Sequence, residues 1–168
     1  MYADRMFRSS FDKVSELFPD IEREHMIIDL AAMMQVQDPS SFDVVVTPDI
    51  YGDILAGIVI GQIGGLGMAP RACIGNRFGF FEPVHGTAFD IAGKGIANPI
   101  ASILPAKLML EWLGEGGEAD RIKNAVCTVL EEGKVRTRDI GGNSSTVDVG
   151  DAIASHIARA HVLFDKEQ

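Results

Sequence analysis

The sequence predicts an α/β fold, and three observations support that prediction. Two short apolar runs, residues 25–29 and 42–47, have the length and side chains of buried strands. Each run leads directly into acidic residues. Around and after them, apolar residues recur at the spacing of helices. Short strands that alternate with helices are typical of α/β proteins, in which ligands gather beyond the carboxyl ends of the strands.

The composition narrows the class of protein. The 168 residues carry a formal charge of −9 without a cluster of Lys or Arg, which argues against nucleic acid or an anionic membrane as partner. No apolar run reaches membrane-spanning length, and the N-terminus lacks the apolar core of a signal peptide. Cys73 and Cys127 are isolated from each other and from histidine, which indicates a reduced, cytoplasmic protein.

Helices are predicted on both sides of the second strand. Phe7, Phe11 and Val14 recur at helical spacing, which predicts an amphipathic helix over residues 3–18. Residues 31–36 indicate a short helix between the two strands. Residues 52–63 are apolar on nearly every side, so this helix is expected to be buried in a core or a subunit interface.

Three further helices are predicted in the last part of the chain. Asn98 is a good N-cap, and the proline that follows it suits the first position of a helix running to about residue 113. Residues 119–132 repeat the helical pattern, and Gly133 is a suitable C-cap. The Ser-Thr-Val-Asp sequence of residues 145–148 matches a capping box that opens the last helix.

A long glycine-rich loop follows a short predicted strand at residues 78–81. Between Gly86 and Gly93 there are six residues, and a glycine follows Lys94, so the loop is not a Walker-type phosphate loop. The G-x-G-x-x-G pattern of dinucleotide-binding folds is absent as well. Backbone amides at the glycines, the ring of His85 and the carboxylate of Asp90 are groups that suit a nucleotide. A structural role for His85 remains the alternative.

Asp49 and Asp53 follow the second predicted strand and are spaced to lie on one face of a helix. Two carboxylates held so close repel each other, and a hard divalent cation that prefers oxygen ligands would offset that repulsion. Asp29, at the end of the first predicted strand, is a third acid of this kind. The alternative is that Asp49 is a helix N-cap and Asp53 a solvated acid of the first turn.

Three segments together carry a specific resemblance. They read Thr-Pro-Asp-Ile-Tyr-Gly-Asp-Ile-Leu from Thr47, Gly-Gly-Leu-Gly-Met-Ala-Pro from Gly64, and Glu-Pro-Val-His-Gly-Thr-Ala-Phe-Asp-Ile-Ala-Gly-Lys-Gly-Ile-Ala-Asn-Pro from Glu82. The chain resembles the β-decarboxylating dehydrogenases, which include 3-isopropylmalate, homoisocitrate, isocitrate and tartrate/D-malate dehydrogenases. The resemblance implies an isopropylmalate dehydrogenase-like α/β fold, here its C-terminal half with parts of both domains. Residues 1–63 would belong to the interface and metal domain, and residues 64–168 to the cofactor domain.

The resemblance also implies roles for individual residues. Asp49 and Asp53 match the acids that bind Mg²⁺ or Mn²⁺ within their own subunit, and Asp29 matches a catalytic acid that reaches the same metal site from the partner subunit of a homodimer. Glu82 matches the acid near the nicotinamide end of NAD. The residues that match the loop around the rest of the cofactor are His85, Gly86, Thr87, Ala88, Asp90, Ile91, Gly93 and Asn98. Asp90 followed by Ile91 indicates NAD rather than NADP, because a carboxylate on the ribose hydroxyls would repel a 2′-phosphate.

The activity implied is oxidation of a small 2-hydroxy acid by hydride transfer to NAD, followed by loss of the β-carboxylate. The favoured substrate is 3-isopropylmalate; tartrate/D-malate, homoisocitrate and isocitrate are alternatives, as is a non-catalytic truncated relative that binds nucleotide or a partner chain. Substrate-binding arginines, a tyrosine and an acid/base lysine are expected in the other half of such proteins. The chain alone is therefore expected to be inactive without a complementary N-terminal chain, and to expose strand edges and apolar surface. Gly57 and Phe89 depart from the family pattern, where an acid and a proline are usual.

Overall fold

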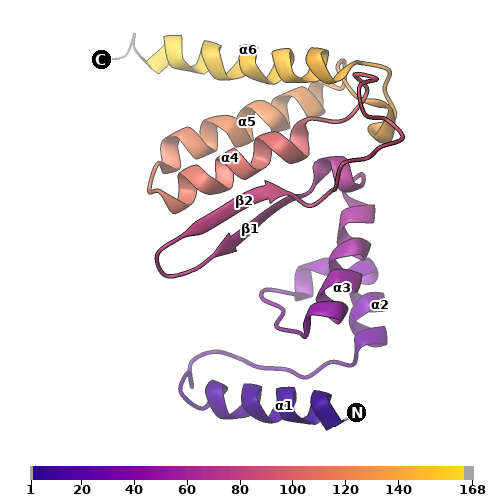
Figure 1. The fold of residues 1–168 in the computed structure, drawn as a ribbon. Helices are drawn as coiled ribbons and strands as arrows, with labels where there is room; N and C mark the ends of the chain where they lie inside the picture. The colour runs from indigo at the N-terminus through magenta and orange to yellow at the C-terminus, as the bar shows by residue number, and fades with distance from the viewer. Residues whose placement is uncertain (1, 165–168) are drawn as a thin grey trace. The chain divides into compact units, whose positions relative to one another are not determined.

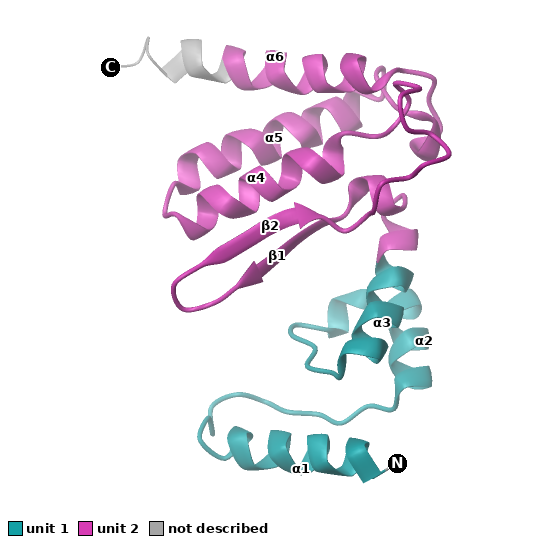
Figure 2. Cartoon of the chain, viewed as in Figure 1, with its two compact units in different colours: residues 1–59 teal, residues 60–168 magenta. Residues whose placement is uncertain are grey.

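The computed structural model describes the backbone of residues 2–164 and the side chains of residues 2–159. The chain divides into two compact units, residues 1–59 and residues 60–168, which Figure 2 shows in different colours. This division lies close to the predicted one at residue 64, but the assignment of the two parts to an interface domain and a cofactor domain stays a prediction. Within the described residues, no helix is both long enough and apolar enough to cross a membrane.

Unit 1 is formed by helices with very little core. It contains α1 (Tyr2–Ser15), α2 (Ile28–Gln37), the short 3₁₀ helix η1 (Pro39–Ser41) and most of α3 (Asp49–Gln62). The helices predicted at residues 3–18 and 31–36 are confirmed, although α1 ends at Ser15. Helix α1 buries none of its side chains. The turn after α1 is held to it by a hydrogen bond between His25 Nε2 and Asp12 Oδ1, at 2.7 Å.

Two predicted strands do not form, and this is the main correction to the sequence analysis. Residues 22–27 have no regular structure, and α2 begins at Ile28, so Asp29 lies in a first helical turn rather than at the end of a strand. Residues 42–47 are not a strand either, and Val44, Val45 and Val46 are 81%, 45% and 60% exposed. A β-branched run favours an extended backbone, but a strand also needs a neighbour to complete its hydrogen bonds. The described residues provide no such neighbour for either run.

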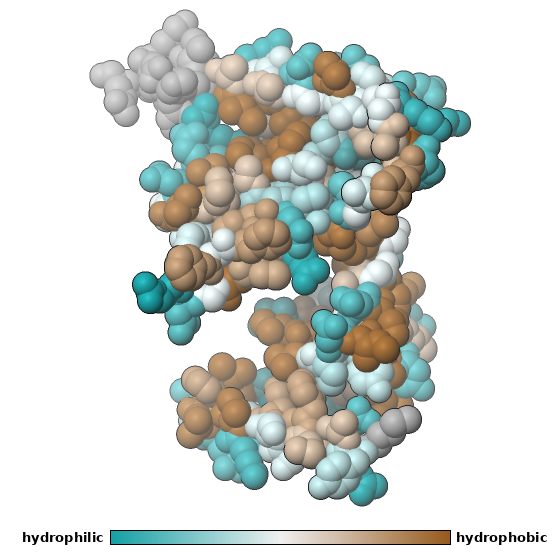
Figure 3. All heavy atoms as spheres, in the orientation of Figure 1, coloured by the Kyte–Doolittle hydropathy of each residue, from teal (hydrophilic) through white to brown (hydrophobic). Residues whose placement is uncertain are grey.

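Helix α3 is present but is not buried in a core of this chain, and its expected burial in a subunit interface stays a prediction. It begins at Asp49, three residues before the predicted start, because the carbonyl of Pro48 accepts hydrogen bonds from the backbone N–H groups of Tyr51 and Gly52. Of its side chains only Leu55 is buried, while Ile50 and Ile54 are 66% and 52% exposed. Figure 3 shows such hydrophobic side chains in brown at the molecular surface. The expectation of exposed apolar surface is confirmed.

Unit 2 is a layered α/β structure (Figure 1). A 3₁₀ helix, η2 (Leu66–Met68), leads into an antiparallel hairpin of β1 (Pro70–Ile74) and β2 (Gly79–Pro83), with Pro70 opposite Pro83. The predicted strand at residues 78–81 is confirmed as part of β2, and β1 was missed. Helix α4 (Ile100–Trp112) covers the hairpin and packs on α5 (Gly116–Glu132), and α5 packs on α6 (Thr146–Phe164). Each edge of this two-stranded sheet is unpaired within the described residues.

The core of unit 2 lies between its three helices. It consists of buried aliphatic side chains from α4, α5 and α6: Ile100, Ala125, Val126, Val129, Val149 and Ile153. All three predicted helices are confirmed, with Gly133 as the C-cap of α5, but the N-cap position of α4 is Pro99, one residue after the predicted Asn98. The Asn98 Oδ1 atom accepts the Ile100 N–H at 3.0 Å, and Gly133 has a left-handed φ of 66° at the end of α5.

The capping box at the start of α6 also forms as predicted. The Ser145 Oγ atom accepts the Asp148 N–H at 3.1 Å, and the Asp148 Oδ2 atom accepts the Ser145 N–H at 2.8 Å. The backbone N–H of Ser145, and after it the Ser145 hydroxyl, lowers the pKa of the Asp148 carboxyl below its ordinary value of 3.8. This reciprocal pair fixes the point where the preceding loop enters the last helix.

Candidate active site

The predicted metal acids lie on two helices of unit 1. Asp49 is the first residue of α3, and Asp53 follows one turn later, so the two carboxylates share one side of the helix. Both residues are exposed. Gly52, which lies between the two acids in the sequence, packs close to Thr47. A Cβ added to Gly52 would lie 3.2 Å from Thr47 Cγ2. Local geometry therefore agrees with the predicted spacing of this pair.

Asp29 is placed differently. It is exposed in the first turn of α2, where its Oδ1 atom accepts the N–H of Leu30 at 2.8 Å. The described residues hold no group of three or more His, Cys, Asp or Glu side chains arranged to hold a metal ion, so Asp29 does not form such a group with Asp49 and Asp53. Two exposed carboxylates one turn apart are nevertheless oxygen donors of the kind that Mg²⁺ and Mn²⁺ bind, often together with water and substrate oxygens.

The predicted cofactor loop begins directly after β2 in unit 2. The hydrogen bonds between β1 and β2 continue by one more bond, which the Val84 N–H donates to the Ala69 carbonyl at 3.1 Å. Glu82, in β2, lies opposite Arg71 in β1, and its Oε1 atom is 4.0 Å from Arg71 Nε. A carboxylate at the base of the loop is thus oriented by a strand pair and lies beside a cation.

The loop then turns through residues 85–95 without helix or strand. His85 is half-buried, and its Nδ1 atom lies 3.0 Å from the Gly86 carbonyl oxygen. Ala88 has a φ of +43°, rare for a residue with a Cβ, and its carbonyl accepts the N–H groups of Ile91 and Ala92, both at 3.0 Å. This turn leaves Thr87 and Asp90 exposed at the surface.

Gly93 follows the turn with a φ of +75°, and a Cβ added there would meet no atom within 4 Å. Such an open, left-handed position lets a ligand approach the backbone closely. The Asp90 carboxylate and the open backbone at Gly93 are therefore accessible at the surface of the loop. The role of the loop in binding a cofactor stays a prediction.

The end of the loop is held by other parts of unit 2. Thr146, the first residue of α6, donates its N–H to the Gly95 carbonyl at 2.9 Å and its hydroxyl to the Ala97 carbonyl at 2.6 Å. Asn98 is 7% exposed, and its Nδ2 atom donates to Asp139 Oδ2 at 3.0 Å. The sequence analysis did not identify Thr146 or Asp139 as site residues. Asn98 and Asp139 are 41 positions apart, a separation at which no local pattern indicates contact.

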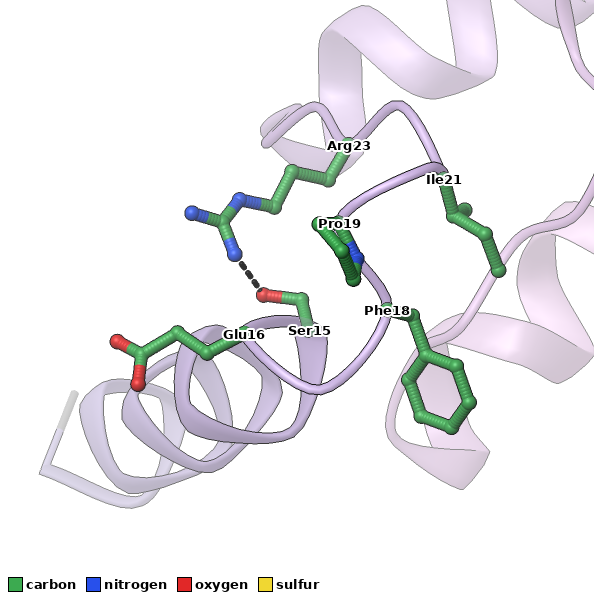
Figure 4. Close-up of a pocket in the computed structure, with 6 residues that line it drawn as sticks. All are labelled: Ser15, Glu16, Phe18, Pro19, Ile21 and Arg23. Atoms are coloured by element: carbon green, nitrogen blue, oxygen red, sulfur yellow. Dashed lines mark hydrogen bonds between the residues drawn. The ribbon is translucent and has the colours of Figure 1, made fainter.

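A separate hollow of about 330 Å³ lies in unit 1, beside the turn that follows α1 (Figure 4). Its lining consists of Ser15, Glu16, Phe18, Pro19, Ile21 and Arg23. Arg23 donates a hydrogen bond to the Ser15 hydroxyl across it. None of the predicted site residues lines this hollow.

Comparisons with known proteins agree with the resemblance. The model of the isocitrate/isopropylmalate dehydrogenase family matches residues 1–153. The chain is 47% identical to the 3-isopropylmalate dehydrogenase of Archaeoglobus fulgidus, over 89% of this chain and 46% of that protein. It is 46% identical to a mitochondrial regulatory subunit of the NAD isocitrate dehydrogenase of Dictyostelium discoideum, over 94% of this chain and 45% of that protein.

A solved structure is similar as well. The crystal structure of isocitrate dehydrogenase from Methylococcus capsulatus matches with a TM-score of 0.85 and 42% identity, covering 90% of this chain and 45% of that one. The α/β fold class is thereby confirmed. The chain spans about half the length of the relatives it matches. With a family model that extends over most of its residues, this chain belongs to the isocitrate/isopropylmalate dehydrogenase family.

Proposed function

We propose that this chain supplies the metal-binding acids and the cofactor loop of an NAD- and divalent-metal-dependent dehydrogenase that oxidatively decarboxylates a malate-type 2-hydroxy acid. The observation that supports this most is the family match over residues 1–153, which includes both the Asp49/Asp53 pair and the whole of the loop. The favoured substrate is 3-isopropylmalate, and tartrate/D-malate, homoisocitrate and isocitrate remain alternatives. The proposed site of action is the cytoplasm.

In this proposal Asp49 and Asp53 hold Mg²⁺ or Mn²⁺ through carboxylate oxygens, and Asp29 of the partner subunit reaches the same site in a homodimer. The backbone amides of the loop hold the cofactor, and Asp90 binds the ribose hydroxyls. When bound, the metal ion supplies Lewis-acid charge and NAD supplies the hydride acceptor. The helix places the two acids one turn apart on the same side, and the carboxylate of Asp90 would disfavour a 2′-phosphate.

A second candidate is a non-catalytic relative that binds nucleotide or pairs with a catalytic chain. It is favoured by the 46% identity to a protein whose name describes it as regulatory. Turnover separates the two candidates. When a complementary N-terminal chain supplies the substrate-binding residues, the dehydrogenase should be active and the non-catalytic relative should not. We propose that such a chain is required for activity.

Binding is tested by titrating the 168-residue chain with NADH and, separately, NADPH, with and without Mn²⁺, and following nucleotide fluorescence. We expect NADH to bind more tightly than NADPH, and Asp90→Ala to reduce that difference. Asp53→Asn is expected to weaken Mn²⁺ binding about tenfold or more, because one ligand loses its charge. Asp20→Asn, which removes another exposed acid outside the site, is the matched control. Failure of both NADH and Mn²⁺ to bind would exclude the dehydrogenase and a nucleotide-binding relative, and would leave only a relative that pairs with a catalytic chain.

Turnover is tested by NADH production from 3-isopropylmalate, tartrate, D-malate, homoisocitrate and isocitrate. The chain is assayed alone and together with a complementary N-terminal chain from a similar enzyme. NADH production by the chain alone would contradict the expected need for a partner. Binding of NADH without turnover in any mixture would favour the non-catalytic candidate.

A further inference from the structure

The side chain of Asn98 forms hydrogen bonds within the protein through both its oxygen and its nitrogen. Its Oδ1 atom accepts the N–H of Ile100 at 3.0 Å, which fixes the first turn of α4. Its Nδ2 atom donates to Asp139 Oδ2 at 3.0 Å and lies 3.4 Å from Met68 Sδ. An asparagine amide has one oxygen and two N–H donors. Both ends of this side chain are therefore already bonded within unit 2.

The backbone of Gly67 lies close against both Asn98 and Asp139. A Cβ added to Gly67 would lie 2.7 Å from Asn98 Cβ and 2.7 Å from Asp139 Oδ2, both too close for a real contact. A Cβ added to Gly64 would lie 3.1 Å from Ile140 Cγ2, so the glycine-rich segment before β1 also meets the 3₁₀ helix η3 (Arg138–Ile140). We call Gly67, Met68, Asn98 and Asp139 the Asn98 cluster. It joins three segments that are far apart in the sequence.

The loop is consequently fixed at both of its ends while its middle is open. At its start it continues the hairpin through Val84, and at its end it is held by Thr146 and by the Asn98 cluster. Thr87, Asp90 and Gly93 lie between these points and are exposed. Of the groups that hold the end of the loop, only the Asp139 carboxylate is charged, and hydrogen bonds to an ionised acceptor are about twice as strong as neutral ones.

We propose that Asp139 is a positioning residue of the cofactor site: through the Asn98 amide it fixes where the open part of the loop stands relative to α4. This inference rests on the proposed function, because it assigns the loop to NAD. It also changes the expected role of Asn98, whose side chain holds the loop in place instead of binding the adenosine half of the cofactor. Asp139 itself touches neither substrate nor cofactor in this arrangement.

Exchanging the side chains of Asn98 and Asp139 distinguishes a role of Asn98 in positioning the loop from direct binding of the nucleotide. Asn98→Asp places two carboxylates against each other, and we expect the Kd for NADH to rise about tenfold or more. Asp139→Asn keeps an accepting oxygen, and a rise of about threefold or less is expected. In the double variant N98D/D139N, the new amide at position 139 can donate to the new carboxylate at position 98, which still accepts the Ile100 N–H. The Kd should therefore return to within about threefold of the original value.

A second approach reaches the cluster without removing any of its hydrogen-bonding groups. Gly67→Ala inserts a methyl group between Asn98 and Asp139, and we expect it to weaken NADH binding as Asn98→Asp does. Gly150→Ala is the matched control, because a Cβ there meets no atom within 4 Å and lies in helix α6. Asp151→Ala, which removes an exposed acid from α6, controls for the loss of charge.

Hydrogen exchange provides a readout that does not need the cofactor. The amides of Ile91, Ala92 and Lys94 are hydrogen-bonded within the loop, at 3.0 to 3.1 Å. In Asn98→Asp and Gly67→Ala their exchange should become faster, while the amides of Val126 and Val129 in the core of α5 stay protected. Equal acceleration in the loop and in α5 would overturn the positioning role, since it would show general destabilisation.

The outcomes separate the inference from the proposed function. Recovery of both NADH affinity and loop protection in N98D/D139N supports the inference. Recovery of loop protection without recovery of affinity would overturn the new role of Asn98, because it would mean that the asparagine amide binds the nucleotide directly. If the unmodified chain binds no NADH, the proposed function fails and the assignment of this loop to NAD fails with it. The exchange data then still decide whether the Asn98 cluster holds the loop.

Discussion

Residues 60–168 and residues 1–59 both form helices rich in apolar side chains, yet those side chains have different surroundings. In unit 2 the helices α4, α5 and α6 pack on one another, and Ile100, Val149 and Ile153 are almost completely buried. In unit 1, Leu55 is the only buried side chain of α3, and Ile50 and Ile54 are largely exposed. Within the described residues, the apolar faces of unit 2 are covered by one another, whereas those of unit 1 have little cover.

The largest expected contrast between the units comes from truncating a core side chain. Ile153→Ala, at a site that is 1% exposed, should lower the free energy of unfolding of unit 2 by about 2–5 kcal/mol, because it removes buried surface and leaves a cavity. Ile54→Ala, at a site 52% exposed, should change the stability of α3 by less than about 0.5 kcal/mol. Native-state hydrogen exchange of α5 and α3 amides measures both. Similar effects in the two units would show that unit 1 has a core of its own.

Replacing a glycine should have opposite signs in the two units. Gly133→Ala forces a Cβ onto a left-handed φ of 66° and against Arg136, so unit 2 should lose about 1–2 kcal/mol. Gly57→Ala in α3 meets no atom within 4 Å and should stabilise that helix by about 0.5–1 kcal/mol. Exchange rates in α5 and α3 again provide the measurement. Destabilisation by Gly57→Ala would mean that another chain or segment approaches α3 at this point.

Helix capping gives a smaller contrast. Ser145→Ala removes half of the capping box of α6 and should cost about 1 kcal/mol in unit 2. Helix α2 of unit 1 has no side-chain cap, because Ile27 occupies the N-cap position. Ile27→Ser should therefore stabilise α2 by about 0.5–1 kcal/mol, which would appear as increased helical circular dichroism. No change in α2 would indicate that its first turn is held by something other than its cap.

The smallest effect is a pH dependence within unit 2. The pKa of the Asp148 carboxyl is lowered in the folded state, first by the Ser145 N–H and then by its hydroxyl. A lowered folded pKa gives stability that is present above the ordinary value of 3.8 and is lost as pH falls through the folded value. Asp148→Asn should remove this loss from acid-unfolding curves, whereas Ser145→Ala should keep most of it because the backbone donor remains. Equal curves for the two variants would contradict this order of causes.

Local signals in the sequence predicted the helices well. Gly133 and Ser145 mark the end of α5 and the start of α6, and Asn98 accepts the first N–H of α4 from one residue before the N-cap, because such effects act within one turn of the backbone. The irregular loop after β2 was also predicted, from its glycines and its mixed polar composition. The two strands expected at residues 25–29 and 42–47 were wrong, since strand formation depends on a neighbour that no local pattern can supply.

The sequence by itself determined the family, the spacing of Asp49 and Asp53 on one helix, and the extent of the irregular loop after β2. These follow from residue types and short separations, which fix helical faces and turns. Only the tertiary structure decided that Asn98 bonds Asp139 across 41 positions, that Gly67 must lack a side chain there, and that α3 lacks cover within this chain. Such contacts depend on how distant segments pack, and packing is set by the shapes of all the neighbours together.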